Sequence, residues 1–187
     1  MSPYDIVHLV LHASGDRVQG RTKLQKMVYF TGVLTGCLEI LGYRPHFYGP
    51  YSSDVASAVD ELLSLGFLEQ RVCSSGAVTS DGFLKARYDY TLTADGRQIA
   101  EEKAHSQPIE WQRISDAVQL LKDSSDDYMR LSIAAKLYFL HGNQRGTASH
   151  EDVIALAPKF GWSVTPKQVS DAADLLQKFG LISLQAS

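Results

Sequence analysis

Hydrophobic residues at the start of the chain recur at the spacing of amphipathic helices. A short helix is predicted over residues 3–14, with Ser2 as its N-terminal cap. After a polar loop at 15–20, a longer helix is predicted from Arg21 to about Gly42, because its apolar residues return every three or four positions. The polar residues of its first turns are expected mostly outside the apolar face: Lys23, Gln25 and Lys26.

A turn, a third helix and a hairpin follow. Residues 43–52 combine aromatic residues with glycine and two prolines, which is typical of a turn. A helix is predicted over 53–65, capped by Ser52 or Ser53. Residues 67–73 and 83–92 favour two strands joined by a polar loop at 74–82. This order predicts a mainly α fold with a small β-wing at 67–92, as in winged helix-turn-helix proteins.

The second half of the chain is predicted to be mainly helical. Thr93 is expected to cap a helix, and residues 106–109 have the composition of a linker. Four helices and a short final strand are then expected, with Thr165 capping the last helix: 110–121, 128–141, 151–160, 166–180 and the strand 181–184. We therefore predict a winged-helix domain at 1–104 and a helical module at 105–187.

The two halves contain a weak internal repeat. Residues 54–68 align with 168–182, and residues 26–30 echo 136–140. One interpretation is a pair of tandem winged-helix-like modules, the second without an obvious wing. The alternative is that amphipathic helices ending at glycine resemble one another by chance.

Composition is that of an ordinary soluble protein, and the charge balance is slightly acidic. No apolar run approaches the roughly 18 residues of a membrane span, and the N-terminus lacks the basic region of a signal peptide, so a cytoplasmic location is expected. Cys37 and Cys73 are far apart in the sequence and are expected to be reduced. The net charge of −3 is not typical of nucleic-acid-binding proteins, although it leaves room for a local basic patch.

Two basic clusters are candidates for contacting phosphates. The first surrounds the start of the second helix, where free backbone amides favour anions: Arg17, Arg21, Lys23 and Lys26. The second lies on the hairpin, and wings often touch the DNA backbone: Arg71, Lys85 and Arg87. In each case the alternative is a solvated surface.

The helix at 53–65 occupies the position of a recognition helix. Three serines are candidates for approaching base edges: Ser52, Ser53 and Ser57. The helix also contains acidic residues and no lysine or arginine: Asp54, Asp60 and Glu61. Because phosphates repel carboxylates, base reading by this helix requires the acids to point away.

The aromatic turn is a candidate surface for a protein partner. The residues proposed to hold that partner are Tyr48, Tyr51 and Asp54. The alternative is that the rings of this turn, including those of His46 and Phe47, close the edge of the core.

The sequence offers little support for catalysis. His8 and His12 are spaced as in helical metal pairs, but no third ligand accompanies them, and histidines on an apolar helix are more often core-edge residues. No nucleophile motif, phosphate loop or pair of catalytic carboxylates stands out. We expect a non-enzymatic protein without a cofactor or a metal.

Three segments resemble a group of bacterial and archaeal proteins. RTKLQK at Arg21–Lys26, YGPYS at Tyr48–Ser52 and LLSLGFL at Leu62–Leu68 resemble the YwgA-like family and the related SocA/Panacea antitoxin domain. The similarity spans roughly residues 1–104 and implies a winged-helix-like fold without catalysis. YwgA-like proteins are usually described as DNA-binding regulators. Panacea-type domains neutralise toxins, and SocA-like members act as proteolytic adaptors.

Two functions follow as expectations. The first is a transcriptional regulator that binds duplex DNA through the basic residues and the three serines, as a homodimer that would match paired half-sites. The second is an antitoxin or proteolytic adaptor that holds a toxin or another protein through the aromatic turn and the acidic helix.

Overall fold

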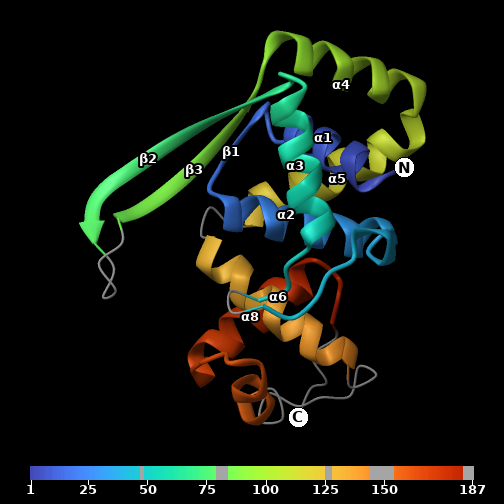
Figure 1. Ribbon diagram of the computed structural model, residues 1–187. Helices are drawn as coiled ribbons and strands as arrows, with labels where there is room; N and C mark the ends of the chain where they lie inside the picture. Colours follow the sequence, from blue (N-terminus) through green and yellow to red (C-terminus); the bar gives the residue numbers. More distant parts are fainter. Residues whose placement is uncertain (47–48, 79–83, 125–127, 144–153, 183–187) are drawn as a thin grey trace.

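The computed structural model describes residues 1–46, 49–78, 84–124, 128–143 and 154–182. These residues are mainly helical and include a three-stranded antiparallel sheet (Figure 1). The prediction of a mainly α protein with a small β element is confirmed. No helix in the described ranges is long and apolar enough to cross a membrane.

The first half of the chain contains both helices and strands. They are α1 (Pro3–Ala13), β1 (Arg17–Gln19), α2 (Arg21–Thr35), the short 3-10 helix η1 (Glu39–Leu41), α3 (Ser53–Ser64), β2 (Leu68–Val78) and β3 (Leu84–Leu92). The second half continues with α4 (Ala94–Ser106), α5 (Pro108–Ser124), α6 (Tyr128–Asn143), the 3-10 helix η2 (Ala157–Phe160) and α8 (Pro166–Lys178).

Side-chain caps fix the starts of four helices, as predicted. Ser2, Thr93 and Thr165 accept hydrogen bonds from backbone amides of α1, α4 and α8. At α3 the cap is Ser52, whose Oγ accepts a 3.0 Å hydrogen bond from the Val55 amide. Each cap satisfies a backbone donor that the helix itself leaves without an acceptor.

The sheet has the strand order β1-β3-β2, with all neighbours antiparallel. Strand β1 was missed because the sequence around it predicts a loop. Its three residues form a strand by pairing with β3, where Val18 lies opposite Tyr90. Strand β2 extends to Val78, so the predicted loop at 74–82 begins too early. Beyond β1, the other two strands project from the helices as a ribbon (Figure 1).

Helix α2 ends earlier than predicted. Gly36 takes a left-handed conformation (φ 76°), and the Cys37 amide donates back to the Gly32 carbonyl at 2.9 Å. Such a residue stops a helix because the backbone can no longer continue the ladder of hydrogen bonds. The predicted extension to Gly42 is wrong, and η1 occupies part of that stretch instead.

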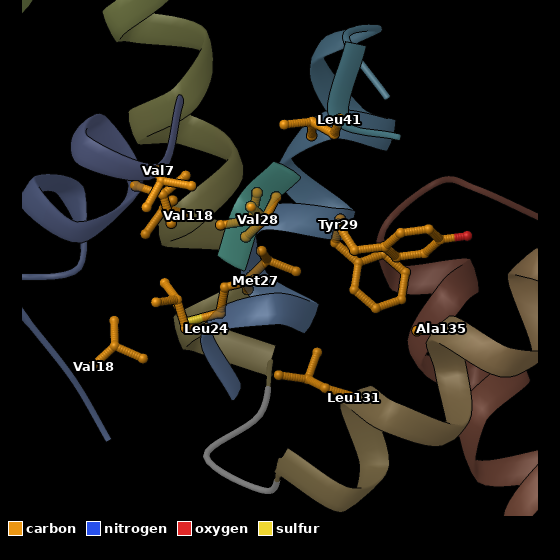
Figure 2. Close-up of a cluster of buried hydrophobic side chains, with 14 of the residues drawn as sticks. Val7, Val18, Leu24, Met27, Val28, Tyr29, Leu41, Val118, Leu131 and Ala135 are labelled. Carbon is orange, nitrogen blue, oxygen red and sulfur yellow. The ribbon is translucent and has the colours of Figure 1, made fainter. Parts of the chain in front are cut away.

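Helix α2 lies at the centre of the core. Side chains from α1, β1, η1, α5 and α6 gather around Leu24, Met27 and Val28 (Figure 2). Helix α5 packs against both α1 and α2, and α6 packs against α2 and α8. The buried side chains of both halves form a continuous cluster.

The predicted linker at 106–109 is wrong. Helix α4 ends at Ser106 and α5 begins at Pro108, so Gln107 alone separates them. The division of the chain into 1–104 and 105–187 stays a prediction. The boundary between the two predicted units falls inside α4, and the next helix, α5, packs against α1 and α2 of the first unit.

Two expected elements near the C-terminus differ where they are described. Within the helix expected at 151–160, residues 154–156 are helical and a 3-10 turn follows, while 151–153 lie outside the described residues. Of the expected strand at 181–184, Leu181 and Ile182 are not in a strand, and the remainder lies outside the described residues.

The internal repeat has a counterpart in local geometry. The Phe67 amide donates to the Leu62 carbonyl, and the Leu181 amide donates to the Leu176 carbonyl, each at 3.0 Å. The glycines that precede these amides, Gly66 and Gly180, are both left-handed. The two helices therefore end alike, and the tandem modules stay a prediction.

Candidate functional site

Two segments that carry the family resemblance meet in space. Gln25 of α2 brackets the backbone of Ser52: its Nε2 donates to the Ser52 carbonyl at 2.9 Å, and the Ser52 amide donates to its Oε1 at 3.1 Å. The Lys26 ammonium donates to the Pro50 carbonyl. Helix α2 thus holds the turn through side-chain contacts with its backbone.

The expectation that Gln25 and Lys26 lie outside the apolar face is wrong. Their exposed fractions are 4% and 2%. Their hydrogen-bond partners, Ser52 and Pro50, lie 27 and 24 positions further along the chain, and periodicity within one helix does not reveal such contacts. Lys26 therefore cannot contact phosphates at the protein surface as predicted.

The turn is wedged between α2 and α6. Gly49 is left-handed (φ 94°), and a Cβ placed there would lie 3.1 Å from Lys136 Cγ and 3.5 Å from Lys26 Cε. Glycine suits this position because it tolerates the left-handed backbone conformation and lacks the Cβ atom that these neighbours would crowd. The Trp162 indole donates to the His46 carbonyl at 2.6 Å, which ties the turn to the C-terminal helices.

The aromatic residues of the turn have mixed positions. Tyr51 is half-buried, and its ring centroid lies 5.1 Å from that of exposed His46. Phe47 and Tyr48 lie outside the described residues, so the predicted role of Tyr48 has no structural counterpart here. Asp54, the third predicted partner-binding residue, is exposed on α3.

Three arginines share the outer face of the sheet. The register places Arg17, Arg71 and Arg87 on the face that carries Asp89, opposite the buried Tyr90. Arg87 makes two hydrogen bonds to the Asp89 carboxylate, at 2.8 and 2.9 Å, and Arg17 lies 3.8 Å from it. The hydrogen bonds from Arg87 lower the pKa of Asp89.

The described side chains of this face have a small positive charge. Glu69 lies on the same face, opposite Thr91, so among the side chains that the structure describes three arginines against two carboxylates leave +1. Lys85 belongs to β3, but its side chain lies outside the described part of the chain. Arg71 and Arg87 thus share a face, and much of their charge is offset by carboxylates.

Arg21 and Lys23 begin α2. The guanidinium of Arg21 lies 4.6 Å from the centroid of the Tyr88 ring, and its Nε donates to the Tyr90 hydroxyl at 3.3 Å. Arg21 is exposed and Lys23 is half-buried. Both positions are compatible with the predicted contact to an anion, unlike that of Lys26.

The exposed side of α3 is acidic. Asp54, Asp60 and Glu61 are exposed, as are Ser53 and Ser57. Ser57 stands three or four positions from each acid, so the serines and the carboxylates occupy the same side of the helix. The acids do not point away, as base reading by this helix would require.

The predicted base contact of Ser52 is wrong. Its side chain is fully buried, accepts from the Val55 amide and donates to the Leu41 carbonyl. Ser52 is a helix cap, whereas the adjacent Ser53 faces solvent.

Two cavities border Tyr51. The larger, of about 390 Å³, lies between the first turns of α2 and the turn, and includes Arg21, Lys26 and His46 in its lining. The smaller, of about 120 Å³, lies towards α3 and β3 and also contacts Arg21. Sequence reasoning missed the larger cavity, although the polar residues Gln25 and Lys26 beside an apolar stripe were a usable signal.

The two spaced histidines are engaged elsewhere. His8 is buried with its Nε2 2.7 Å from the Gly96 carbonyl, and His12 Nδ1 lies 2.8 Å from Asp16 Oδ1. Among the described residues no cluster of three metal-ligating side chains occurs. Cys37 and Cys73 are both free thiols, as expected.

Comparison with known proteins gives one informative match. No family model matches the chain. The chain is 37% identical over 84 residues to the uncharacterized protein YwgA of Bacillus subtilis (strain 168). It is similar to YwgA. The aligned stretch covers 45% of this chain and 46% of YwgA, so the chain spans about half the length of the curated relative that it matches.

Proposed function

We propose that this protein is a non-enzymatic module of winged-helix type that binds a basic surface of a partner protein through the exposed side of α3. The observation that carries the proposal is the charge of that side. Helix α3 holds three exposed carboxylates and no cation along its twelve residues. Such a surface repels phosphates and attracts lysine and arginine on a protein.

The topology supports the winged-helix assignment. The order α1, β1, α2, α3, β2, β3 and the sheet order β1-β3-β2 are compatible with a winged helix-turn-helix. In that arrangement α3 is the helix that would read DNA, and the β2–β3 ribbon is the wing. A protein that keeps this scaffold but has an acidic α3 is suited to another kind of partner.

The resemblance to SocA/Panacea domains suggests the class of partner. Those domains act on toxins, so a toxin with a basic surface is the partner that we propose to look for first. The acidic residues of α3 would guide its approach and fix its orientation, because charge complementarity contributes to encounter rate and specificity.

Co-purification from the native cells tests this proposal. The wild type is compared with the double variant Asp60→Lys/Glu61→Lys on α3 and with a matched control, Glu101→Lys/Glu102→Lys, on the exposed surface of α4. We expect a protein that is retained by the wild type and by the control but lost with the α3 variant. Equal retention by all three would refute the assignment of α3.

Duplex DNA is a second candidate, favoured by the arginines of the outer sheet face. Arg17, Arg71 and Arg87, together with exposed Arg21, would contact phosphates. Contacts of this kind position a protein on DNA without reading its sequence. A homodimer is part of this candidate. Asp89 and Glu69 reduce the attraction of the sheet face for phosphates. The acidic α3 argues against DNA binding, whereas the arginines of the sheet face argue for it.

Fluorescence anisotropy with duplex from the upstream region of the gene decides between the candidates. Binding that is tight at about 50 mM salt, weakens many-fold at about 200 mM and is lost in Arg87→Glu would establish the DNA candidate. Absence of binding at the lower salt concentration would leave the protein partner as the remaining proposal.

A further inference from the structure

The larger cavity beside Tyr51 has no role in the proposed recognition by α3. Its volume of about 390 Å³ lies within the roughly 300–1,000 Å³ that is usual for small-molecule sites. Its lining combines two cations, Arg21 and Lys26, with the rings of His46 and Tyr51. A cavity of this size with convergent charged groups has the form of a binding site.

The cavity contains an uncompensated positive charge. Lys26 is 2% exposed and donates a hydrogen bond to the neutral Pro50 carbonyl. Within the described ranges no carboxylate lies at ion-pair distance from its ammonium. Lys136 approaches the same glycine from α6 and adds positive charge. Buried charges are normally paired, so an anion in the cavity would stabilise the charged form of Lys26.

The walls of the cavity determine what kind of anion suits it. The rings of His46 and Tyr51, with centroids 5.1 Å apart and planes inclined at 36°, provide an aromatic surface for an organic group. A bare inorganic ion would leave that surface unused. The combination of a cationic end with aromatic walls matches a carboxylate attached to a small organic group.

We propose that this cavity binds a small organic carboxylate, free or as the C-terminal residue of a peptide, with its carboxylate beside Lys26 and Arg21 and its organic part against Tyr51. The proposal stands apart from recognition by α3, since none of these residues belongs to that helix. The cavity would then bind either a free small acid or the C-terminal carboxylate of a peptide.

Binding should be linked to the protonation of Lys26. Burial, together with the charge of Lys136, lowers the pKa of Lys26 to about 7. If the charged form binds the acid, affinity follows the protonated fraction and falls roughly 25-fold between about pH 6.5 and 8.5. Among the described residues, the other titratable groups around the cavity are Arg21, His46, Tyr51 and Lys136. The variant His46→Gln separates any contribution of the imidazole from that of the lysine.

Titration of the full-length protein with three probes, followed by two-dimensional NMR of the backbone amides, tests the proposal. The probes are acetate, N-acetylalanine and its uncharged amide, N-acetylalaninamide. We expect saturable shifts at Thr22 and Gly49 with an acid, weaker binding at higher pH, and no binding of the amide. Binding by acetate indicates a free acid as the ligand, and binding by N-acetylalanine alone indicates a chain end.

Two variants and a control complete the experiment. Lys26→Met should lose binding, and Arg21→Gln should weaken it at least several-fold without loss of folding, because Arg21 is exposed. Lys122→Met removes an exposed lysine of α5 and should bind as the wild type does. Equal binding of acid and amide, pH-independent affinity in both the wild type and His46→Gln, or no saturation by either acid below about 100 mM would overturn the proposal. Should Lys26→Met fail to fold, Arg21→Gln and the pH series decide.

Discussion

Replacing Ser52 by alanine should destabilise the protein through two lost hydrogen bonds. The Ser52 hydroxyl accepts from the Val55 amide as the cap of α3 and donates to the Leu41 carbonyl, and the residue is fully buried. Loss of the cap costs about 1 kcal/mol. Loss of the buried hydrogen bond to Leu41 costs about 1 kcal/mol more. For a chain of this length, about 2 kcal/mol lowers the melting temperature by about 4–8 °C.

Urea unfolding measures this loss, with Ser53→Ala as the matched control. Ser53 is the next residue and is exposed, so its replacement should change the free energy of unfolding by less than about 0.5 kcal/mol. The midpoint should fall in Ser52→Ala while the m-value stays unchanged. If both alanine variants unfold at the same midpoint, the assignment of Ser52 as a buried cap is refuted.

Three further predictions concern buried contacts, each measured by urea unfolding. The pKa of Lys26, about 7, lies below its ordinary value of 10.5, so the unfolded chain binds more protons than the folded protein between these pH values, and stability should rise from pH 7 to about 9. The variant Lys26→Met should lose this rise in stability. If the variant keeps the rise, the argument from the burial of Lys26 is contradicted. Burial raises the pKa of Asp5, but hydrogen bonds from Lys103 and Ser2 outweigh it and lower the pKa to about 2 from 3.8. The resulting stability is present above pH 4 and is lost as pH falls towards 2, a loss that should be smaller in Asp5→Asn. Trp162→Phe should cost about 1 kcal/mol, because the His46 carbonyl loses its indole donor; an unchanged midpoint would show that this hydrogen bond contributes nothing.

Elements with a local chemical signal were predictable from the sequence. A serine or threonine ahead of an apolar run marked the starts of α1, α3, α4 and α8, because the cap acts within three residues of itself. The apolar stripes of α2 and α3 were equally local. The grouping of Arg71 with Arg87 also followed from the sequence, since a hairpin brings its two strands together.

Features that depend on distant partners were missed. Strand β1 is too short to show a period and forms by pairing with β3, about seventy residues later. The burial of Lys26 depends on a turn that follows α2, and a lysine carries no sign that a carbonyl will cover it. The cavity was missed for the same reason, since its two sides belong to different segments of the chain.

The central position of α2 affects how the protein is made. Its apolar side chains are covered partly by α5 and α6, which end at Ser124 and Asn143. During synthesis, the first hundred residues leave the ribosome before these covering helices exist. The nascent chain therefore exposes part of its core until about forty more residues have been added, which takes about 2–8 seconds at about 5–20 residues per second. Over that interval the unfinished protein is open to chaperones, proteases and other nascent chains.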